Sequence, residues 1–503
     1  MNEFDDVALL LLIVVPLFGS LSMMFMPGGQ SKESWYFAIF IAALSLALAL
    51  IVFANYDYDE GGFQCIASYE WLPGPLDIAL SLGIDGISAP MVLLNGIVLM
   101  GGVLVSQTVK HRTRDFFVLL FALSAGVYGV FVVRDLFFLF FFYELAVLPM
   151  YLLIGIWGSS TDFKTFVRTK EYGAMKLLIF LVGGSILVWI GILALYVEAS
   201  EAGAATFSLT GLAQLAENGQ FDSDFQTLVF PLFMLGFGVL AGLWPFHTWS
   251  PDGHVAAPTA VSMLHAGVLM KLGAYGIIRV GMVLLPEGAD AWMPVLITLG
   301  TVNVLYGAVS AMSQSDLKYI IGYSSVSHMG YVLMGIATLD NIGVGGAVLQ
   351  MFSHGIMTAL MFLLVGAIYE RTHTRDISVL NGLAKRMPKN TFFFAIAGLA
   401  SLGLPGLSGF IAEFMVFTGA FRTYLPLAIL AVIGAALTAI YILRLLARTF
   451  MGEPDERWND LTDSSPIEMS VGATFVGIIL FVGIWPDPLL RVINVGVQTI
   501  TGV

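Results

Sequence analysis

Stretches of about 20 mostly apolar residues recur from one end of this 503-residue chain to the other. A helix needs about 20 such residues to cross a hydrocarbon core of roughly 30 Å. Only 11% of the residues are charged, whereas soluble domains average roughly a quarter. Backbone polar groups must be bonded internally within lipid, which favours helices. The sequence therefore predicts an all-α polytopic membrane protein with no room for a soluble catalytic domain.

Polar breaks divide the apolar runs into about fourteen expected transmembrane helices. Seven are expected near residues 6–26, 34–54, 86–106, 115–132, 136–157, 172–197 and 226–245. Seven more are expected near residues 259–283, 291–312, 317–337, 341–369, 391–419, 424–447 and 466–487. The first apolar run lacks a basic leader and a small-residue cleavage site, so we expect it to be retained as a span.

Basic residues gather in alternate loops, as expected when cytoplasmic loops retain Lys and Arg. One set of loops holds 15 of them: Lys32, Lys110, Arg112, Arg114, Lys164, Arg168, Lys170, Lys318, Arg371, Arg375, Lys385, Arg386, Lys389, Arg448 and Arg457. The opposite set holds only Arg134, Arg422 and Arg491 and includes both long acidic loops. We therefore expect both termini on the non-cytoplasmic side. Arg279 and Arg444 lie toward span ends, where they can snorkel to the headgroups.

Two apolar segments are interrupted by helix breakers at comparable places in the two halves. They read GLWPFHTWSPDGHVAAPT over residues 242–259 and SLGLPGLSG over residues 401–409. Proline removes a backbone donor, and lipid does not tolerate the freed groups unless they face protein or water. Paired broken helices are also typical of inverted-repeat transporters whose working site lies near the bilayer midplane. The plainer alternative is a proline kink at a packing contact.

Four ionisable side chains fall within or beside these spans, although a charge at the bilayer centre costs at least about 2.5–3.5 kcal/mol. They are Glu144, Lys176, Lys271 and Glu413. Lys271 is the best candidate for a proton carrier, because burial favours neutral lysine and a nearby carboxylate favours charged lysine. A static ion pair is the alternative for Lys271, and snorkelling is the alternative for Lys176. Glu413, just past the second break, suits a proton exit.

Three histidines accompany these residues: His247 after the first break, and His328 and His354 midway along two later spans. A buried histidine is more often a core residue than a ligand. Imidazole accepts a proton on one nitrogen and donates from the other, however, as a proton relay requires. The histidines lack the compact spacing of a metal site, so we predict none.

Several other classes of function are excluded by composition. The 22 Lys and Arg residues form no large basic surface, which argues against nucleic-acid binding. A single cysteine, Cys65, rules out both an intrachain disulfide and a Cys-ligated iron–sulfur cluster. Any redox centre must therefore belong to another chain.

The quoted segments, together with LSLGIDGISAPMVLL, FFYELAVLPMYLLIGIWG, LKYIIGYSSVSHMGYVLMGI and LPGLSGFIAEFMVF, resemble a known family. It is that of the antiporter-like subunits of respiratory complex I, the proton-translocating NADH:quinone oxidoreductase, and most closely its chain M (chain 4) group. The resemblance covers nearly the whole chain. It implies fourteen helices in two inverted five-helix repeats, each with one discontinuous helix, in a bacterial inner membrane.

The resemblance also implies a domain organisation and partners. We expect one membrane domain over residues 1–503, with N-terminal helices in 1–110, a first repeat in 111–283, a second repeat in 284–450 and a C-terminal helix in 451–503. Other membrane-arm subunits, especially neighbouring antiporter-like ones, are the implied partners besides the lipid bilayer. FMN, iron–sulfur clusters and quinone are expected in partner subunits and no cofactor in this chain.

Matched to the family motifs, Glu144, Lys176, Lys271 and Glu413 correspond to its functional residues on helices five, six, eight and twelve. His247, His328 and His354 correspond to the connecting histidines. One position departs from the pattern, since Leu240 stands where the family places the lysine that partners the helix-five glutamate. Either Lys176 partners Glu144 and keeps a modified relay, or the entry route through Glu144 is lost.

The function expected is outward proton pumping coupled to quinone reduction elsewhere in the complex, with no redox chemistry in this chain. Two alternatives remain open. One is a subunit of a multi-subunit sodium/proton antiporter or a membrane-bound hydrogenase. The other is a spacer subunit that keeps the fold without pumping, which Leu240 favours.

Overall fold

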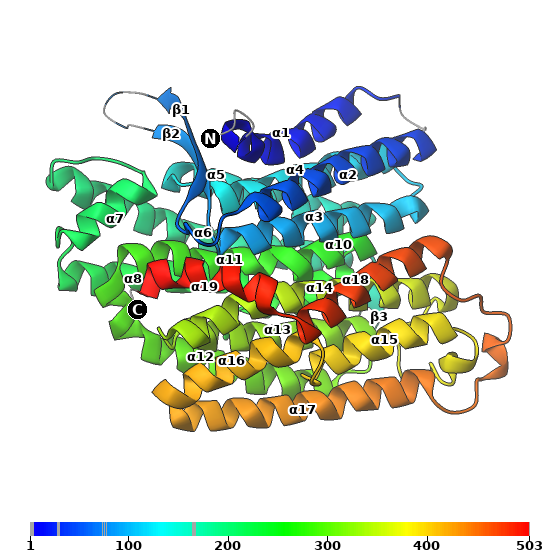
Figure 1. Ribbon diagram of the computed structural model, residues 1–503. Helices are drawn as coiled ribbons and strands as arrows, with labels where there is room; N and C mark the ends of the chain where they lie inside the picture. Colours follow the sequence, from blue (N-terminus) through cyan, green and yellow to red (C-terminus); the bar gives the residue numbers. More distant parts are fainter. Residues whose placement is uncertain are drawn as a thin grey trace.

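The computed structural model describes residues 5–27, 31–72, 74, 76, 78–162 and 167–501, so Lys164 lies outside the described residues. Long helices run side by side in a bundle, with two short antiparallel hairpins at its ends (Figure 1). The first half contains α1 (Asp5–Met24), α2 (Ser31–Asn55), β1 (Gln64–Leu72), β2 (Ile78–Ile84), α3 (Ser88–Val105), η1 (Ser106–Thr108), α4 (Thr113–Val132), α5 (Leu136–Trp157), β3 (Thr161–Asp162), β4 (Val167–Arg168), α6 (Lys170–Glu201), α7 (Leu209–Glu217), α8 (Ser223–Ala241) and α9 (Trp249–Ala256).

The second half begins with one continuous helix divided into α10 (Thr259–Leu264), η2 (His265–Leu269), α11 (Met270–Gly276) and η3 (Ile277–Met282). Its η2 and η3 segments are π-helical. There follow α12 (Pro286–Ser313), α13 (Leu317–Ile336), α14 (Asn341–Thr372), η4 (Leu383–Lys385), α15 (Pro388–Ser401), α16 (Ser408–Thr423), α17 (Leu425–Phe450), η5 (Glu456–Trp458), α18 (Pro466–Ile484) and α19 (Asp487–Thr501).

The predicted number of spans is confirmed. Among the described residues, 12 helices are long and apolar enough to cross a membrane. The 20-residue α13 and the broken α15–α16 pair complete the fourteen that the sequence predicts. The spans over Thr259–Met282 and Asn341–Thr372 have fully buried windows, so they form the centre of the bundle. These two central helices carry Lys271 and His354.

The two broken helices are confirmed and occupy equivalent places. Counting spans from α4, the break after α8 falls in the fourth, and counting from α12, the break between α15 and α16 again falls in the fourth. These two sets of five run in opposite directions. Each break uses a glycine in the left-handed region, where side chains are strained: Gly242 at φ 79° and Gly403 at φ 69°.

The polar groups freed at the first break are bonded from a neighbouring helix. Asn303 on α12 donates to the Gly242 carbonyl over 2.8 Å and accepts from the Trp244 amide over 2.5 Å. The indole of Trp249 donates to the Val239 carbonyl over 2.9 Å. Protein groups therefore replace the helix hydrogen bonds that the break removes, as a membrane interior requires.

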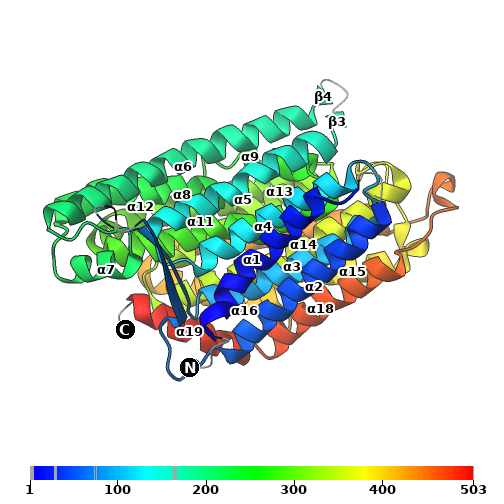
Figure 2. The ribbon, with the colours of Figure 1, turned by 90° about the horizontal axis from the view of Figure 1, so that it is seen from above.

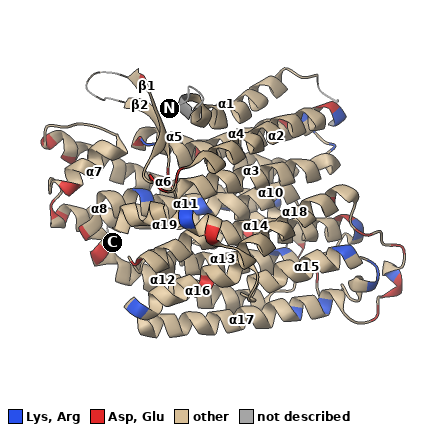
Figure 3. Cartoon of the chain, in the orientation of Figure 1, with Lys and Arg blue, Asp and Glu red and all other residues tan. Residues whose placement is uncertain are grey.

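The two ends of the bundle differ in charge. Lys and Arg residues gather at one end, which we name the basic end after the loops that contain Lys110, Arg375 and Lys385 (Figure 3). The other end carries the β1–β2 hairpin and α7, and we name it the hairpin end (Figure 2). Helix α1 begins and α19 ends toward the hairpin end.

Candidate functional site

Lys271 lies in α11, between the two π-helical segments, and is fully buried. Its ammonium donates to the carbonyl of Ala266 and lies 2.8 Å from Nδ1 of His354 on α14. A buried lysine needs such partners, because an unpaired ammonium in a low-dielectric interior is costly. The structure therefore joins the two central helices through their ionisable side chains.

The same line of side chains continues from His354 to Glu413. The rings of His354 and His328 have centroids 5.3 Å apart. Nδ1 of His328 lies 3.2 Å from Oε1 of Glu413 on α16, and Nε2 of His328 contacts the Ser401 hydroxyl at 3.0 Å. All these side chains are buried. Four residues that the sequence singled out thus meet as one chain, in the order Lys271, His354, His328 and Glu413.

Backbone geometry holds both ends of this chain in place. A Cβ atom on Gly355 would lie 2.6 Å from the carbonyl oxygen of Gly267, so α14 and η2 touch beside the Lys271–His354 contact. A Cβ atom on Gly403 would lie 2.9 Å from Oε2 of Glu413. Glycine at position 355 leaves room for the backbone of η2, and glycine at position 403 leaves room for the Glu413 carboxylate.

Of the two alternatives left open for Glu144, the one in which Lys176 is its partner does not match the structure. Lys176 instead bonds Oδ2 of Asp252 on α9 over 2.8 Å. The polar neighbour of the Glu144 carboxyl group is the hydroxyl of Ser185, nine residues beyond Lys176 on α6. Nine residues of α-helix rise about 13 Å, which places the two side chains at different depths. Snorkelling is excluded as well, because Lys176 points to a buried acid.

Asp252 is the centre of a second polar cluster, toward the basic end. Its Oδ1 accepts from Arg168 over 2.5 Å and from the Tyr319 hydroxyl over 2.9 Å. The Asp252 side chain is only 5% exposed, whereas those of Arg168 and Lys176 are 30% and 19% exposed. Burial acts to lower the pKa of Arg168, but the charges and hydrogen bonds of Asp252 and Tyr319 together outweigh it and raise that pKa overall.

His247 does not join the line from Lys271. Its ring meets that of Tyr306 edge-on, with centroids 4.9 Å apart, and it lies within electrostatic range of Lys176. Two other histidines lie in the core instead: His254 on α9 and His265 in η2 have ring centroids 3.9 Å apart. Both are fully buried and lie within electrostatic range of Lys271.

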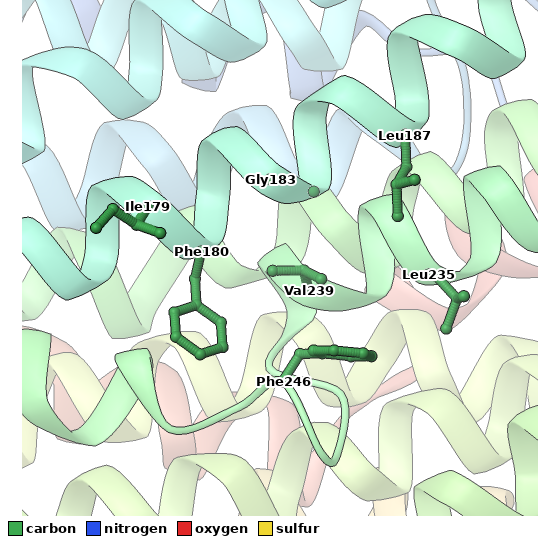
Figure 4. A pocket seen from close by; sticks show the side chains of 8 residues that line it. Ile179, Phe180, Gly183, Leu187, Leu235, Val239 and Phe246 are labelled. Atoms are coloured by element: carbon green, nitrogen blue, oxygen red, sulfur yellow. The ribbon is translucent and has the colours of Figure 1, made fainter.

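Leu240 is fully buried, and the residues on either side of it in the sequence, Val239 and Ala241, are buried apolar residues as well. A cavity of about 390 Å³ lies between α6, α8 and the first break (Figure 4). It is lined by Ile179, Phe180, Gly183, Gly184, Leu187, Leu235, Val239 and Phe246. None of these residues has an ionisable side chain, so no residue that lines the cavity can carry a proton.

The described residues include no group of three His, Cys, Asp or Glu side chains placed to hold a metal ion. The chemistry that this arrangement supports is proton transfer along buried side chains.

Comparison with known proteins agrees with this geometry. The family model of the NADH:quinone oxidoreductase/Mrp antiporter transmembrane proteins matches residues 133–438, more than half of the chain. The chain belongs to this family. The match runs from the start of α5 to within α17, so it includes both broken helices and every candidate residue.

Relatives within the family are similar over almost their whole length. The NAD(P)H-quinone oxidoreductase chain 4 1 of Synechococcus sp. (strain JA-3-3Ab) is 38% identical, over 96% of this chain and 91% of the relative. Chain 4 of Acaryochloris marina is 38% identical over 96% of this chain and 90% of the relative. The resemblance predicted from the motifs is thereby confirmed.

Two solved structures have the same fold. A chain of respiratory complex I from Thermus thermophilus superposes with a TM-score of 0.88 at 27% identity, covering 98% of this chain and 99% of that one. A chain of the Mrp complex from Dietzia sp. DQ12-45-1b superposes with a TM-score of 0.86 at 20% identity, covering 99% and 98%. The second likeness concerns the fold alone.

Proposed function

We propose that this chain is a proton-translocating membrane-arm subunit of a complex I type NAD(P)H:quinone oxidoreductase. Its membership of the family and its likeness to a complex I chain support this assignment. Oxidation of NAD(P)H and reduction of quinone take place in partner subunits, which hold the FMN, the iron–sulfur clusters and the quinone. This chain makes and breaks no covalent bond other than those of moving protons.

The continuous line from Lys271 to Glu413 carries the proposal. Lys271 hands a proton to His354 across 2.8 Å. His354 passes it to the adjacent His328 ring by a turn of that imidazole, because both nitrogens of His328 face other groups. His328 then passes it to the carboxylate 3.2 Å away. Each imidazole accepts on one nitrogen and donates from the other, so the protons move by relay and the helices stay in place.

Protons enter from the basic end, by a route that does not need a lysine at position 240. Lys318 is buried and donates to the Ala257 carbonyl over 2.7 Å, next to the helix that carries His254. His254 and His265 are in ring contact, and His265 lies within electrostatic range of Lys271. We name the residues Lys318, His254 and His265 the entry line. This line supports active pumping despite Leu240, and Lys176 and Asp252 lie beside the entry line.

The surroundings follow from the same assignment. The basic end faces the cytoplasm of a bacterial inner membrane, and both termini face the opposite side, in accordance with the distribution of Lys and Arg. The domains are residues 1–110, a repeat over 111–283, a repeat over 284–450 and residues 451–503. Neighbouring antiporter-like subunits of the membrane arm are the partners.

Substituting Lys271 tests the function. In the complete complex in liposomes, Lys271→Met should lower the number of protons moved per NAD(P)H oxidised by this subunit's share, while electron transfer continues. Lys385→Met is the matched control, because Lys385 forms an exposed pair with Glu453 at the basic end. That variant should pump as the unaltered complex does.

Leu240, in place of the lysine that the resemblance implies, is the observation that favours the rival, a non-pumping spacer. An unchanged proton-to-electron ratio in Lys271→Met would establish the spacer and refute the relay. Replacing Na⁺ by K⁺ on both sides separates the antiporter alternative, because a sodium-coupled subunit loses its ion transport and a proton relay does not.

A further inference from the structure

A buried cluster of charged residues at the hairpin end takes no part in the line described above. It contains Asp85, directly after β2, Arg134, between α4 and α5, and Arg279, in η3. The position of Arg279 near a span end suggested that its side chain could reach the headgroups. It does not do so, because the side chain is only 5% exposed and forms an ion pair with Asp85. The aromatic ring of Phe63, just before β1, covers the cluster.

The charge of Asp85 is fully engaged. Its Oδ2 pairs with Arg279, and its Oδ1 accepts from the amides of Ile87 at 3.2 Å and Ser88 at 2.9 Å, where α3 begins. The Asp85 side chain is 2% exposed. One carboxylate thus neutralises one guanidinium and fixes the start of a helix.

Arg134 brings a second positive charge to the same place. It donates to the neutral hydroxyl of Thr210 over 2.6 Å. Its guanidinium carbon lies 4.6 Å from the centre of the Phe63 ring, and that of Arg279 lies 4.8 Å from the same centre. The two guanidinium groups are close enough to repel each other. Together with Asp85 they carry a formal charge of +1.

One member of this cluster, Arg279, lies on the helix that carries Lys271. Arg279 follows Lys271 by eight residues, about 12 Å along the helix axis toward the hairpin end. Tyr275 lies between them, with its ring 5.6 Å from the Arg279 guanidinium and its hydroxyl donating to the Phe131 carbonyl over 3.2 Å. The cluster therefore lies between the proton carrier and the water beyond the hairpin.

We propose that Arg134 and Arg279, held against Phe63, form an electrostatic barrier that stops protons from returning to Lys271 through the hairpin end. A fixed positive charge in a narrow, low-dielectric passage excludes cations, including protons. Arginine keeps its charge at any physiological pH, so it blocks where a lysine or histidine would relay. Protons on Lys271 then leave only toward His354 and Glu413. This inference rests on the proposed function of Lys271.

The test measures passive proton leak across liposomes that contain the complete complex, with substrate absent and a pH difference imposed. Arg134→Gln keeps a donor for Thr210 and removes the excess charge. Both guanidinium groups contact the same Phe63 ring, so we take for Arg134 the distance of about 12 Å derived for Arg279. Loss of one unit charge at that distance, at an effective dielectric constant of about 20, should speed the leak about tenfold. Arg422→Gln, which removes an exposed arginine, should leave the leak unchanged.

A double variant decides whether the leak uses the proposed path. Lys271→Met added to Arg134→Gln should return the leak to its original rate. A leak that persists in the double variant, or an assembled Arg134→Gln complex as tight as the unaltered one, refutes the barrier. Arg134→Met, which removes the same charge, provides a second single variant if Arg134→Gln fails to assemble, with the same expected leak and the same refuting results. Loss of pumping in Lys271→Met remains a separate measurement, so the barrier and the relay can fail independently.

Discussion

Replacing Asp252 by asparagine removes the anion that Arg168 and Lys176 share. At N–O distances of about 2.8 Å and an effective dielectric constant of about 20, each attraction is worth about 6 kcal/mol. The cost of desolvating the charges offsets most of this, and removing one partner of a buried pair typically costs about 3–5 kcal/mol. Since Arg168 and Lys176 are 30% and 19% exposed, water screens part of the loss, and we expect about 3 kcal/mol.

That loss should appear both in stability and in pumping. About 3 kcal/mol shifts the equilibrium between the paired and the separated cluster roughly a hundredfold. The thermal inactivation temperature of the purified complex should therefore fall in Asp252→Asn, and protons moved per NAD(P)H should fall because the entry line is disturbed. Asp252→Glu keeps the charge and should recover part of both.

Asp455→Asn is the control, since Asp455 forms an exposed pair with Arg457 at the same end. Exposed pairs contribute about 0–1 kcal/mol, so this variant should resemble the unaltered complex. The reasoning is refuted if Asp252→Asn matches the control in inactivation temperature and in proton-to-electron ratio. Asp252 would then contribute neither to the stability of the basic end nor to proton pumping.

Three further predictions concern the glycines and position 240. Gly355→Ala places a methyl group 2.6 Å from the Gly267 carbonyl and should destabilise the complex by about 1–3 kcal/mol through overpacking, measured as a lower inactivation temperature. Gly403→Ala, at φ 69° and 2.9 Å from Glu413, should cost at least about 1 kcal/mol and slow proton release, measured as a reduced pumping ratio. Leu240→Lys should cost about 2.5–3.5 kcal/mol in a Glu144→Gln background and clearly less when Glu144 is intact, and equal costs in the two backgrounds would show that these positions do not interact.

The fourteen helices and the two breaks could be predicted because both are local properties of the sequence. The length of an apolar run predicts a membrane-spanning helix, and proline and glycine close together within such a run predict an interruption of that helix. Lys271, His328, His354 and Glu413 could be identified for a related reason: an ionisable side chain within an apolar run is costly wherever it points. The resemblance implied that they connect, but their order, with His354 next to Lys271 and His328 next to Glu413, was not visible, because spacing along separate helices does not fix which faces touch.

Asp252 was missed because it follows a break, where the sequence pattern is that of a loop and an acid carries no penalty. Its partner Arg168 likewise lies in a loop segment, so neither charge stands out by hydropathy. The ion pair of Asp85 with Arg279 joins residues 194 apart in the chain. Such pairings are products of tertiary packing, and only the structure reports them.

The contact between Gly267 and Gly355 limits how Lys271, the proposed proton carrier, can be switched. Two backbones that touch this closely act as a rigid joint: one helix cannot slide past the other without driving a carbonyl into its neighbour. A signal from the redox partners therefore cannot reach Lys271 by displacing α14 against its companion. It must arrive as a change of electric field or of side-chain rotamer, within a frame that stays still.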